Sequence, residues 1–309
     1  MARNNKPGRI IKSTAIVPTL KKASGIWTLD EAMQAHRDNA WPQPNLYQPI
    51  ANSLRNSLGK TAYISRESPA RSGSKRKFTF SWWLKKNSNA TASQQHLHYS
   101  YDGSRLFQIF FERSGSTNPD AICVYGGGTD VRFIPVLRDT SAWYHIVIAV
   151  DIDQSTSSNR IKCWLNGVQI TDVGTQGGSP GTPSWPTSAT NWPISQAGVY
   201  QRIGGSAGGG TLDGQFAEIN FIDGYAVPPT FFGKYDTNNT WVPVEYTGTY
   251  GTNGFYLPFD NATTSQTLGY DASNTDTTDY DVDQDPYRGS VALHLTGNGP
   301  AGGNNNSFA

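Results

Sequence analysis

The acidic residues best placed for catalysis lie in segment 218–223, Glu-Ile-Asn-Phe-Ile-Asp. Alternate positions of a β-strand share one face at a spacing of roughly 7 Å, which suits two carboxylates that cleave a glycosidic bond as nucleophile and general acid. Asn220 stands where the second carboxylate would be needed, and Asp223 precedes a glycine as turn residues do. Without proton sharing between two carboxylates nothing tunes Glu218 for catalysis. The pattern therefore favours a solvent-facing Glu218 and a protein that is not an enzyme.

Two other groups of side chains have the composition of metal ligands. His96 and His98 are expected on one face of a strand, a compatible spacing, but the sequence shows no third ligand. The alternating aspartates of residues 279–285 could surround Ca²⁺, although the segment lacks the central glycine and later glutamate of the helical calcium loop. A polar strand face explains the histidines equally well, and a solvated acidic tail is the favoured interpretation of the aspartates. We therefore expect neither a metal ion nor a cofactor.

Two tryptophans in the longest loop are the candidates for glycan binding. Trp185 and Trp192 both lie in residues 175–198, which are rich in Gly, Pro, Ser and Thr. An exposed indole ring can stack on the C–H face of a sugar. Each tryptophan also precedes a proline, and such pairs often fold back as braces over a core. Binding and bracing both remain open for these two rings.

The ends of the chain carry opposite charges, although the formal net charge is only +1. All charged residues of segment 1–22 are basic, and all those of segment 260–285 are acidic. Neither segment has a core-forming pattern, so only a partner could order it. Besides a simply solvated tail, we consider that the basic arm of one subunit pairs with the acidic tail of a neighbour.

A short helix is expected after the basic arm. Thr28 with Glu31 three residues later forms a capping box, and Pro42 ends the pattern. The apolar surface of this helix is large for its size, so we expect it to dock on another subunit or on its own domain. The arm and helix together supply the candidate assembly residues, namely Arg3, Lys6, Arg9, Lys12, Ile26, Trp27 and Trp41.

Two adjacent strands are the clearest elements in the sequence. Alternate residues of segment 144–152 are apolar, and segment 161–166 alternates in the same way and is followed by the tight turn Asn166-Gly167. A hydrophobic fraction of 36% with 32 Gly and 18 Pro indicates many short strands and turns. We predict an all-β protein, a two-sheet antiparallel jelly-roll sandwich with an extended N-terminal arm and a short helix.

This architecture divides the chain into three parts. Residues 1–50 form the arm and helix, residues 51–262 the jelly roll, and residues 263–309 an acidic and then Gly/Asn-rich tail. No segment approaches the roughly 20 apolar residues of a membrane span, and no signal peptide is visible. Cys123 and Cys163 fall in expected strands, where they would be buried free thiols.

Several segments together resemble a known family. The segment 138–171, RDTSAWYHIVIAVDIDQSTSSNRIKCWLNGVQIT, resembles laminin G-like, concanavalin A-like jelly-roll domains of bacteriophage virion proteins, as do residues 212–236 and 241–259. KFTFSWWLKK is similar to an opening strand of those domains, and residues 25–42 are similar to leader segments of phage fibre subunits. The resemblance covers residues 25–272. The same superfamily contains β-glucanases with an E-x-D-x-x-E or E-x-D-x-E strand, from which this chain departs at Asn220.

The resemblance implies a virion surface component: a tail fibre, spike or capsid-decoration subunit that serves host attachment or particle stabilisation. It would be made in the host cytoplasm, contact other virion proteins and form a homo-oligomer, with a trimer as the expected form and a host surface glycan as a further partner. The alternatives are a dedicated receptor-recognition lectin and a polysaccharide-degrading glycosidase. The basic segment 66–86 lacks groove-reading elements, so no specific nucleic acid is expected, and neither is membrane insertion.

Overall fold

The chain divides into two units, Met1–Pro49 and Ile50–Ala309, in the computed structural model. The residues that the structure describes are 30, 33–34, 50, 52–57, 62–68, 72–89, 91–174, 182–206, 208–259, 271–273 and, for the backbone, 292–295. In the first unit, Asp30, Met33 and Gln34 are helical, within the predicted short helix. The candidate assembly residues Arg3, Lys6, Arg9, Lys12, Ile26, Trp27 and Trp41 lie outside the described residues, as do the aspartates of residues 279–285.

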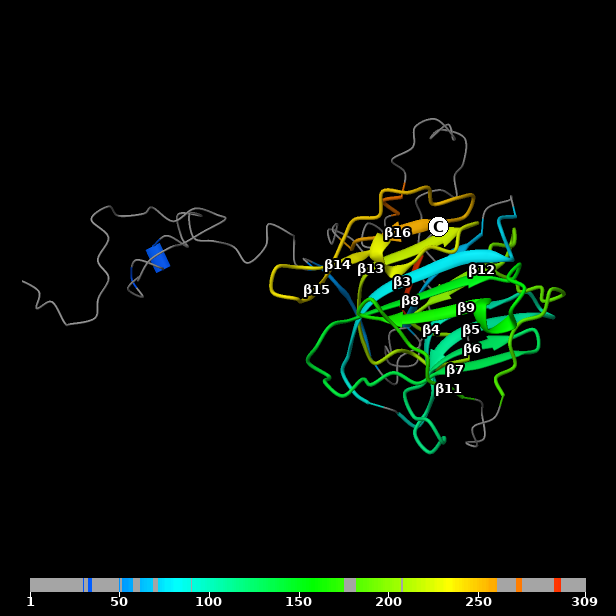
Figure 1. The fold of residues 1–309 in the computed structure, drawn as a ribbon, viewed down its shortest axis with the longest axis horizontal. Helices are drawn as coiled ribbons and strands as arrows, with labels where there is room; N and C mark the ends of the chain where they lie inside the picture. The colour runs from blue at the N-terminus through cyan, green and yellow to red at the C-terminus, as the bar shows by residue number, and fades with distance from the viewer. Residues whose placement is uncertain are drawn as a thin grey trace, which may run out of the picture. The chain divides into compact units, whose positions relative to one another are not determined.

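One sheet of the second unit is seven-stranded and antiparallel, in the order β1-β13-β3-β8-β9-β10, with β16 also paired to β13. Its strands are β1 (Leu54–Asn56), β3 (Lys77–Lys86), β8 (Tyr144–Asp151), β9 (Ile161–Leu165), β10 (Val168–Gln169), β13 (Gly214–Asp223) and β16 (Phe255–Leu257). The predicted central pair is β8 and β9, which place Val147 opposite Trp164. Figure 1 shows β13, β3, β8 and β9 side by side.

The second sheet is eight-stranded, in the order β11-β7-β6-β5-β4-β12-β2-β17. Its strands are β2 (Ala62–Glu67), β4 (Gln95–Tyr101), β5 (Leu106–Phe111), β6 (Ile122–Gly126), β7 (Thr129–Phe133), β11 (Val173–Gly174), β12 (Tyr200–Ile203) and β17 (Ala292–Leu295). A separate hairpin joins β14 (Gly233–Tyr235) to β15 (Trp241–Pro243), and two 3-10 turns cover Ser157–Asn159 and Pro229–Phe231.

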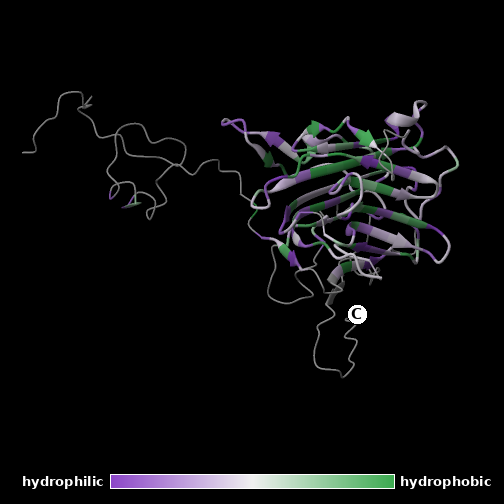
Figure 2. Ribbon diagram, turned by 90° about the horizontal axis from the view of Figure 1, so that it is seen from below, coloured by the Kyte–Doolittle hydropathy of each residue, from purple (hydrophilic) through white to green (hydrophobic). Residues whose placement is uncertain are grey.

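The core lies between the two sheets and is rich in aromatic rings. Alternate residues of β3 point into it, among them Phe78, Phe80 and Trp82, all of which are fully buried. Phe78 meets Phe107 of the other sheet edge-on, with ring centroids 5.5 Å apart. Many strands carry both hydrophobic and hydrophilic residues, as Figure 2 shows by colour. The predicted jelly-roll sandwich is confirmed, and Cys123 and Cys163 are buried free thiols.

The outer face of the seven-stranded sheet is covered by residues 225–250. Val147 and Ile222 of the sheet form a second apolar cluster with Phe232 and Tyr246 of this covering segment. The sequence pattern predicts irregular structure for residues 225–232 and 241–246, but residues 241–243 form β15. The hairpin is stable here because its rings gain a buried apolar surface to pack on.

His145 lies beneath this cover and is fully buried. Its Nδ1 accepts a hydrogen bond from Trp241 Nε1 at 2.9 Å, so Nε2 carries the proton and donates it to Ser81 Oγ at 2.9 Å. The ring stacks on Trp83 with centroids 4.8 Å apart. Burial lowers the pKa of His145 to about 3, so the imidazole is neutral and structural.

Candidate functional site

Glu218 lies at an irregularity of β13, where the register with β3 shifts between Ala217 and Asn220. Its φ of +48° belongs to the left-handed region, which β-branched and most other side chains avoid. The Tyr256 hydroxyl donates to Glu218 Oε2 at 2.5 Å. The side chain is therefore half-buried against Tyr256, and the prediction that it simply faces solvent is wrong. A bulge of this kind is not visible in the alternation of residue types.

The two positions of β13 that could complete a carboxylate pair with Glu218 have structural roles instead. Asn220 Oδ1 accepts a hydrogen bond from the Tyr250 hydroxyl at 2.8 Å, which fixes the amide in a structural role. Asp223 is buried and accepts the backbone N–H groups of Ser74 and Asn253 at 2.7 and 3.0 Å. Burial raises the pKa of Asp223. Because its contacts tie two loops together, its role is nevertheless structural.

The two histidines of β4 do not share a face. A register shift lies between His96 and His98. His98 packs in the core against Phe80, with centroids 4.6 Å apart, and burial lowers its pKa to about 3. His96 instead bonds Gln108 Oε1 at 2.7 Å. The expected common face is thus wrong because of the bulge, and no group of three or more His, Cys, Asp or Glu among the described residues could hold a metal ion.

Trp192 braces the sandwich. Its side chain is 0% exposed, its Nε1 donates to the Gly126 carbonyl at 2.8 Å, and its ring packs on Phe107 with centroids 4.8 Å apart. The expectation of an exposed ring that stacks on sugar is therefore wrong for Trp192. Apolar contact with the core gives this ring more stabilisation than an exposed position in the loop would.

Trp185 is half-buried and packs edge-on against Phe133 of β7, with centroids 6.4 Å apart. Part of the indole remains accessible, so glycan binding by this residue stays a prediction. The adjacent Ser184 exchanges backbone hydrogen bonds with Asp130 at 2.9 and 3.0 Å, which holds the tryptophan against the end of the eight-stranded sheet.

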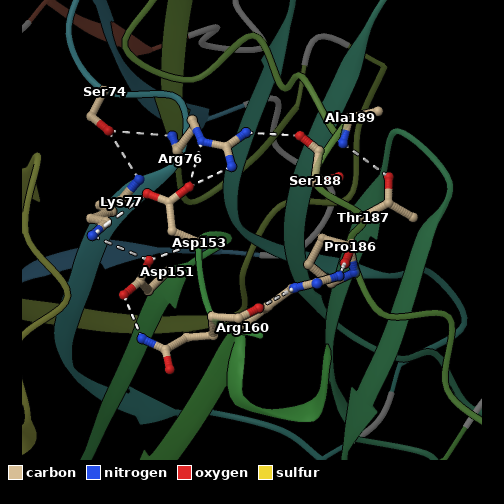
Figure 3. Close-up of polar contacts among 11 residues, drawn as sticks. Ser74, Arg76, Lys77, Asp151, Asp153, Arg160, Pro186, Thr187, Ser188 and Ala189 are labelled. Carbon is tan, nitrogen blue, oxygen red and sulfur yellow. Dashed lines mark hydrogen bonds and ion pairs between the residues drawn. The ribbon is translucent and has the colours of Figure 1, made fainter. Parts of the chain in front are cut away.

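Two arginines fix the loop between the tryptophans, as Figure 3 shows. Arg76 donates to the Ser188 carbonyl at 2.8 Å, and Arg160 donates to the Pro186 carbonyl at 2.7 Å. Arg76 also pairs with Asp153, so its guanidinium is oriented from two sides. Charge-assisted hydrogen bonds to carbonyls satisfy backbone groups that a loop otherwise leaves to water. The described part of the loop is thus held to the sandwich.

The outer face of the eight-stranded sheet carries a group of aromatic side chains. Adjacent residues of a strand point to opposite faces, so residues next to core positions point outward. The tyrosine face, as we call it, comprises Tyr63, Tyr99, Tyr101, Tyr125 and Tyr200. Tyr101, Tyr125 and Tyr200 are 47%, 39% and 47% exposed, while the other two are half-buried.

Strand register aligns part of the tyrosine face into a row. Arg202 of β12 lies opposite Tyr99 of β4, Tyr99 opposite Gln108 of β5, and Gln108 opposite Tyr125 of β6. Three strand spacings make this row about 14 Å long. It presents rings, an amide and a guanidinium on a hydrogen-bonded sheet, and such rigid support keeps a binding surface preorganised.

Arg202 lies among three tyrosine rings. Its guanidinium carbon is 5.4 Å from the ring centroid of Tyr63 and 5.8 Å from those of Tyr99 and Tyr200. These distances are those of cation–π contacts. The Glu67 carboxylate beside Tyr200 raises the pKa of that phenol, mainly by charge repulsion of the phenolate. Sequence reasoning missed this site: the alternation of Tyr99 and Tyr101 is visible, but the register that brings distant strands together is not.

Comparison with known families agrees with this fold. A laminin G family model, described as the concanavalin A-like lectin/glucanases superfamily, matches residues 58–227, more than half of the chain. The chain belongs to this superfamily. No curated protein sequence matches it. In the described residues, no helix is long and apolar enough to span a bilayer.

Several solved structures are similar to the chain at low sequence identity. A heptameric SAP-like pentraxin from Limulus polyphemus is 12% identical, with 58% of this chain and 79% of that chain covered and a TM-score of 0.38. Domain 4 of the extracellular arabinanase AbnA from Geobacillus stearothermophilus, in complex with arabinotriose, is 16% identical, with 60% and 82% covered and a TM-score of 0.34. Tailspike protein 2 of Escherichia coli O157:H7 bacteriophage CAB120 is 13% identical, with 63% and 29% covered and a TM-score of 0.31. Function does not follow from similarities at this level.

Proposed function

We propose that this chain is a non-enzymatic subunit of a bacteriophage particle, a tail fibre, spike or capsid-decoration protein, whose jelly roll binds a glycan of the host surface. The tyrosine face is the observation that carries the binding function. The virion context rests on the resemblance of residues 25–272 to phage domains. Membership of a lectin-containing superfamily supports the binding function in general terms.

The tyrosine face suits carbohydrate because sugars present both C–H faces and hydroxyl groups. Aromatic rings provide apolar surface to the former, and phenol and amide groups exchange hydrogen bonds with the latter. Tyr101, Tyr125 and Tyr200 expose such rings on neighbouring or near-neighbouring strands. A single face of this size binds weakly, so assembly into a symmetric oligomer, such as a trimer, would raise the overall affinity through effective concentration.

Glycan arrays of host surface polysaccharides, probed with the full-length chain, test the binding function. We expect Y125A and Y101A each to weaken binding about three- to tenfold, because each removes one stacking ring. Y225A is the matched control, since Tyr225 is 51% exposed but lies in the segment that covers the other sheet. Absence of binding to every glycan, or equal losses in Y225A, would contradict this site.

Two further measurements test the rest of the proposal. We expect no release of reducing sugar when the chain is incubated with the polysaccharides that it binds, because Asn220 stands where β13 would need the second carboxylate of a catalytic pair. Antibodies against the chain should label phage particles in electron micrographs. Release of reducing sugar would show a glycosidase, and unlabelled particles would exclude a virion protein.

A further inference from the structure

We infer that the tyrosine face selects glycans that carry carboxylates, and that Arg202 is the residue that recognises the carboxylate. The inference rests on the proposed glycan-binding function and specifies its ligand. It starts from the position of one cation, Arg202, among three aromatic rings of the tyrosine face.

Arg202 differs from four other arginines of the sandwich in what surrounds it. Several arginines form ion pairs with carboxylates at hydrogen-bonding range: Arg66 with Asp271, Arg76 with Asp153, Arg105 with Asp102, and Arg132 with Glu112 and Asp130. In the described part of the chain Arg202 has no such ion pair, and its buried Nε has no hydrogen-bond partner. No ion pair in the described part of the chain therefore neutralises the Arg202 guanidinium, and an external carboxylate would do so.

The three tyrosine rings explain how the positive charge of Arg202 is stabilised on this face and how the guanidinium is oriented. Cation–π contact with Tyr63, Tyr99 and Tyr200 stabilises the guanidinium and limits its motion, while it leaves N–H groups for a ligand. A planar guanidinium matches a planar carboxylate through two parallel hydrogen bonds, which a point charge cannot do.

The tyrosine face also carries acidic groups. They favour a ligand with few carboxylates and many hydroxyls over a polymer with a high density of negative charge. Asp130, at the far end of the row, is paired with Arg132. Glu67 is exposed and bonds the Tyr200 hydroxyl, so it can accept a sugar hydroxyl but would repel a second anionic group. Gln108 lies between Tyr99 and Tyr125 and provides a neutral polar group. The ligand class that fits is a sugar acid with one carboxylate per residue, flanked by hydroxyls.

The test compares each acidic polymer with its own carboxyl-reduced form. Polygalacturonate, alginate and polysialic acid, with their reduced counterparts, are titrated against the full-length chain at low salt. We expect at least one acidic form to bind about tenfold or more tightly than its reduced form. R202Q should remove that preference while it leaves binding to the reduced polymer, and R202K should restore part of it. R138Q is the control, because Arg138 is exposed and lies outside the strands of the tyrosine face.

The outcomes separate this inference from the proposed function. Equal binding of the acidic and reduced forms by the unaltered chain overturns the inference and leaves glycan binding intact. No binding to any glycan overturns both. Equally tight binding of heparin and of single-stranded DNA would show a general polyanion site and would also overturn it. Should R202Q fail to fold in circular dichroism, the comparison of polymers with the unaltered chain and with R202K still decides.

Discussion

Replacement of Trp192 by alanine should destabilise the sandwich strongly. This substitution tests the role of the ring in folding and not its role in sugar binding. The ring is fully buried between the sheets, where it meets Phe78 edge-on with centroids 6.0 Å apart and Phe107 at 4.8 Å. Removal of a large buried aromatic side chain costs about 3–5 kcal/mol, because transfer free energy is lost and a cavity remains. W192A also leaves the Gly126 carbonyl without its donor, which adds about 1 kcal/mol.

Two matched variants divide this cost into its parts. W192F keeps most of the apolar ring but loses the hydrogen bond to Gly126, so we expect a loss of about 1–3 kcal/mol. W185A removes a ring that is only half-buried, and we expect about 1–2 kcal/mol. We therefore expect W192A to lose the most stability, and W192F to lose at least as much as W185A. Burial of the ring and the hydrogen bond to Gly126 determine this order.

Urea unfolding followed by far-ultraviolet circular dichroism measures these differences as shifts of the midpoint at constant slope. The sheet signal is preferable to fluorescence because the chain has nine tryptophans. The reasoning is refuted if W192A lowers the free energy of unfolding by less than about 1 kcal/mol, well below the cavity range. It is also refuted if W192A remains as stable as the unaltered chain and loses glycan binding, since the ring would then act as a sugar platform.

Two other predictions concern acid stability and assembly. His98 and His145 have pKa values lowered to about 3 by burial, below the unfolded value of about 6.5. Their contribution to stability is therefore complete above pH 6.5 and is lost progressively as the pH falls toward 3, by about 2 kcal/mol for each histidine at pH 5. Urea titrations at pH 7 and pH 5 measure this loss, H145Q should reduce it by about half, and equal stability at both pH values would contradict it. For assembly, deletion of residues 1–22 should yield a folded but unassembled chain in light scattering, and raised salt should weaken assembly of the full chain. Normal assembly of the truncated chain would exclude the basic arm as an attachment device.

Local alternation predicted the fold well but could not predict the site. In β8 and β9 every second residue is apolar, and the turn Asn166-Gly167 has the positive φ values, 48° and 81°, that its sequence indicates. Those signals lie within one hairpin. The tyrosine face, by contrast, depends on pairing of β12 with β4 across about a hundred residues, which no local pattern encodes.

The bulges were the second limit on prediction. A single inserted residue between His96 and His98 sends the second imidazole into the core, and the irregularity at Glu218 turns a regular strand position into a half-buried contact with Tyr256. Alternation assumes an unbroken period of two, so it assigns every residue beyond a bulge to the wrong face.

The contrast between the outer faces of the two sheets supports a binding role for the tyrosines. On the seven-stranded sheet, the outward Val147 and Ile222 are buried under Phe232 and Tyr246 of the covering segment. Outward positions of the eight-stranded sheet instead carry exposed tyrosines, such as Tyr101. A purely solvated face needs no aromatic rings, because small polar or charged residues suffice. Exposed phenols combine apolar area with a hydroxyl, and they tolerate water until a ligand with both kinds of surface replaces it.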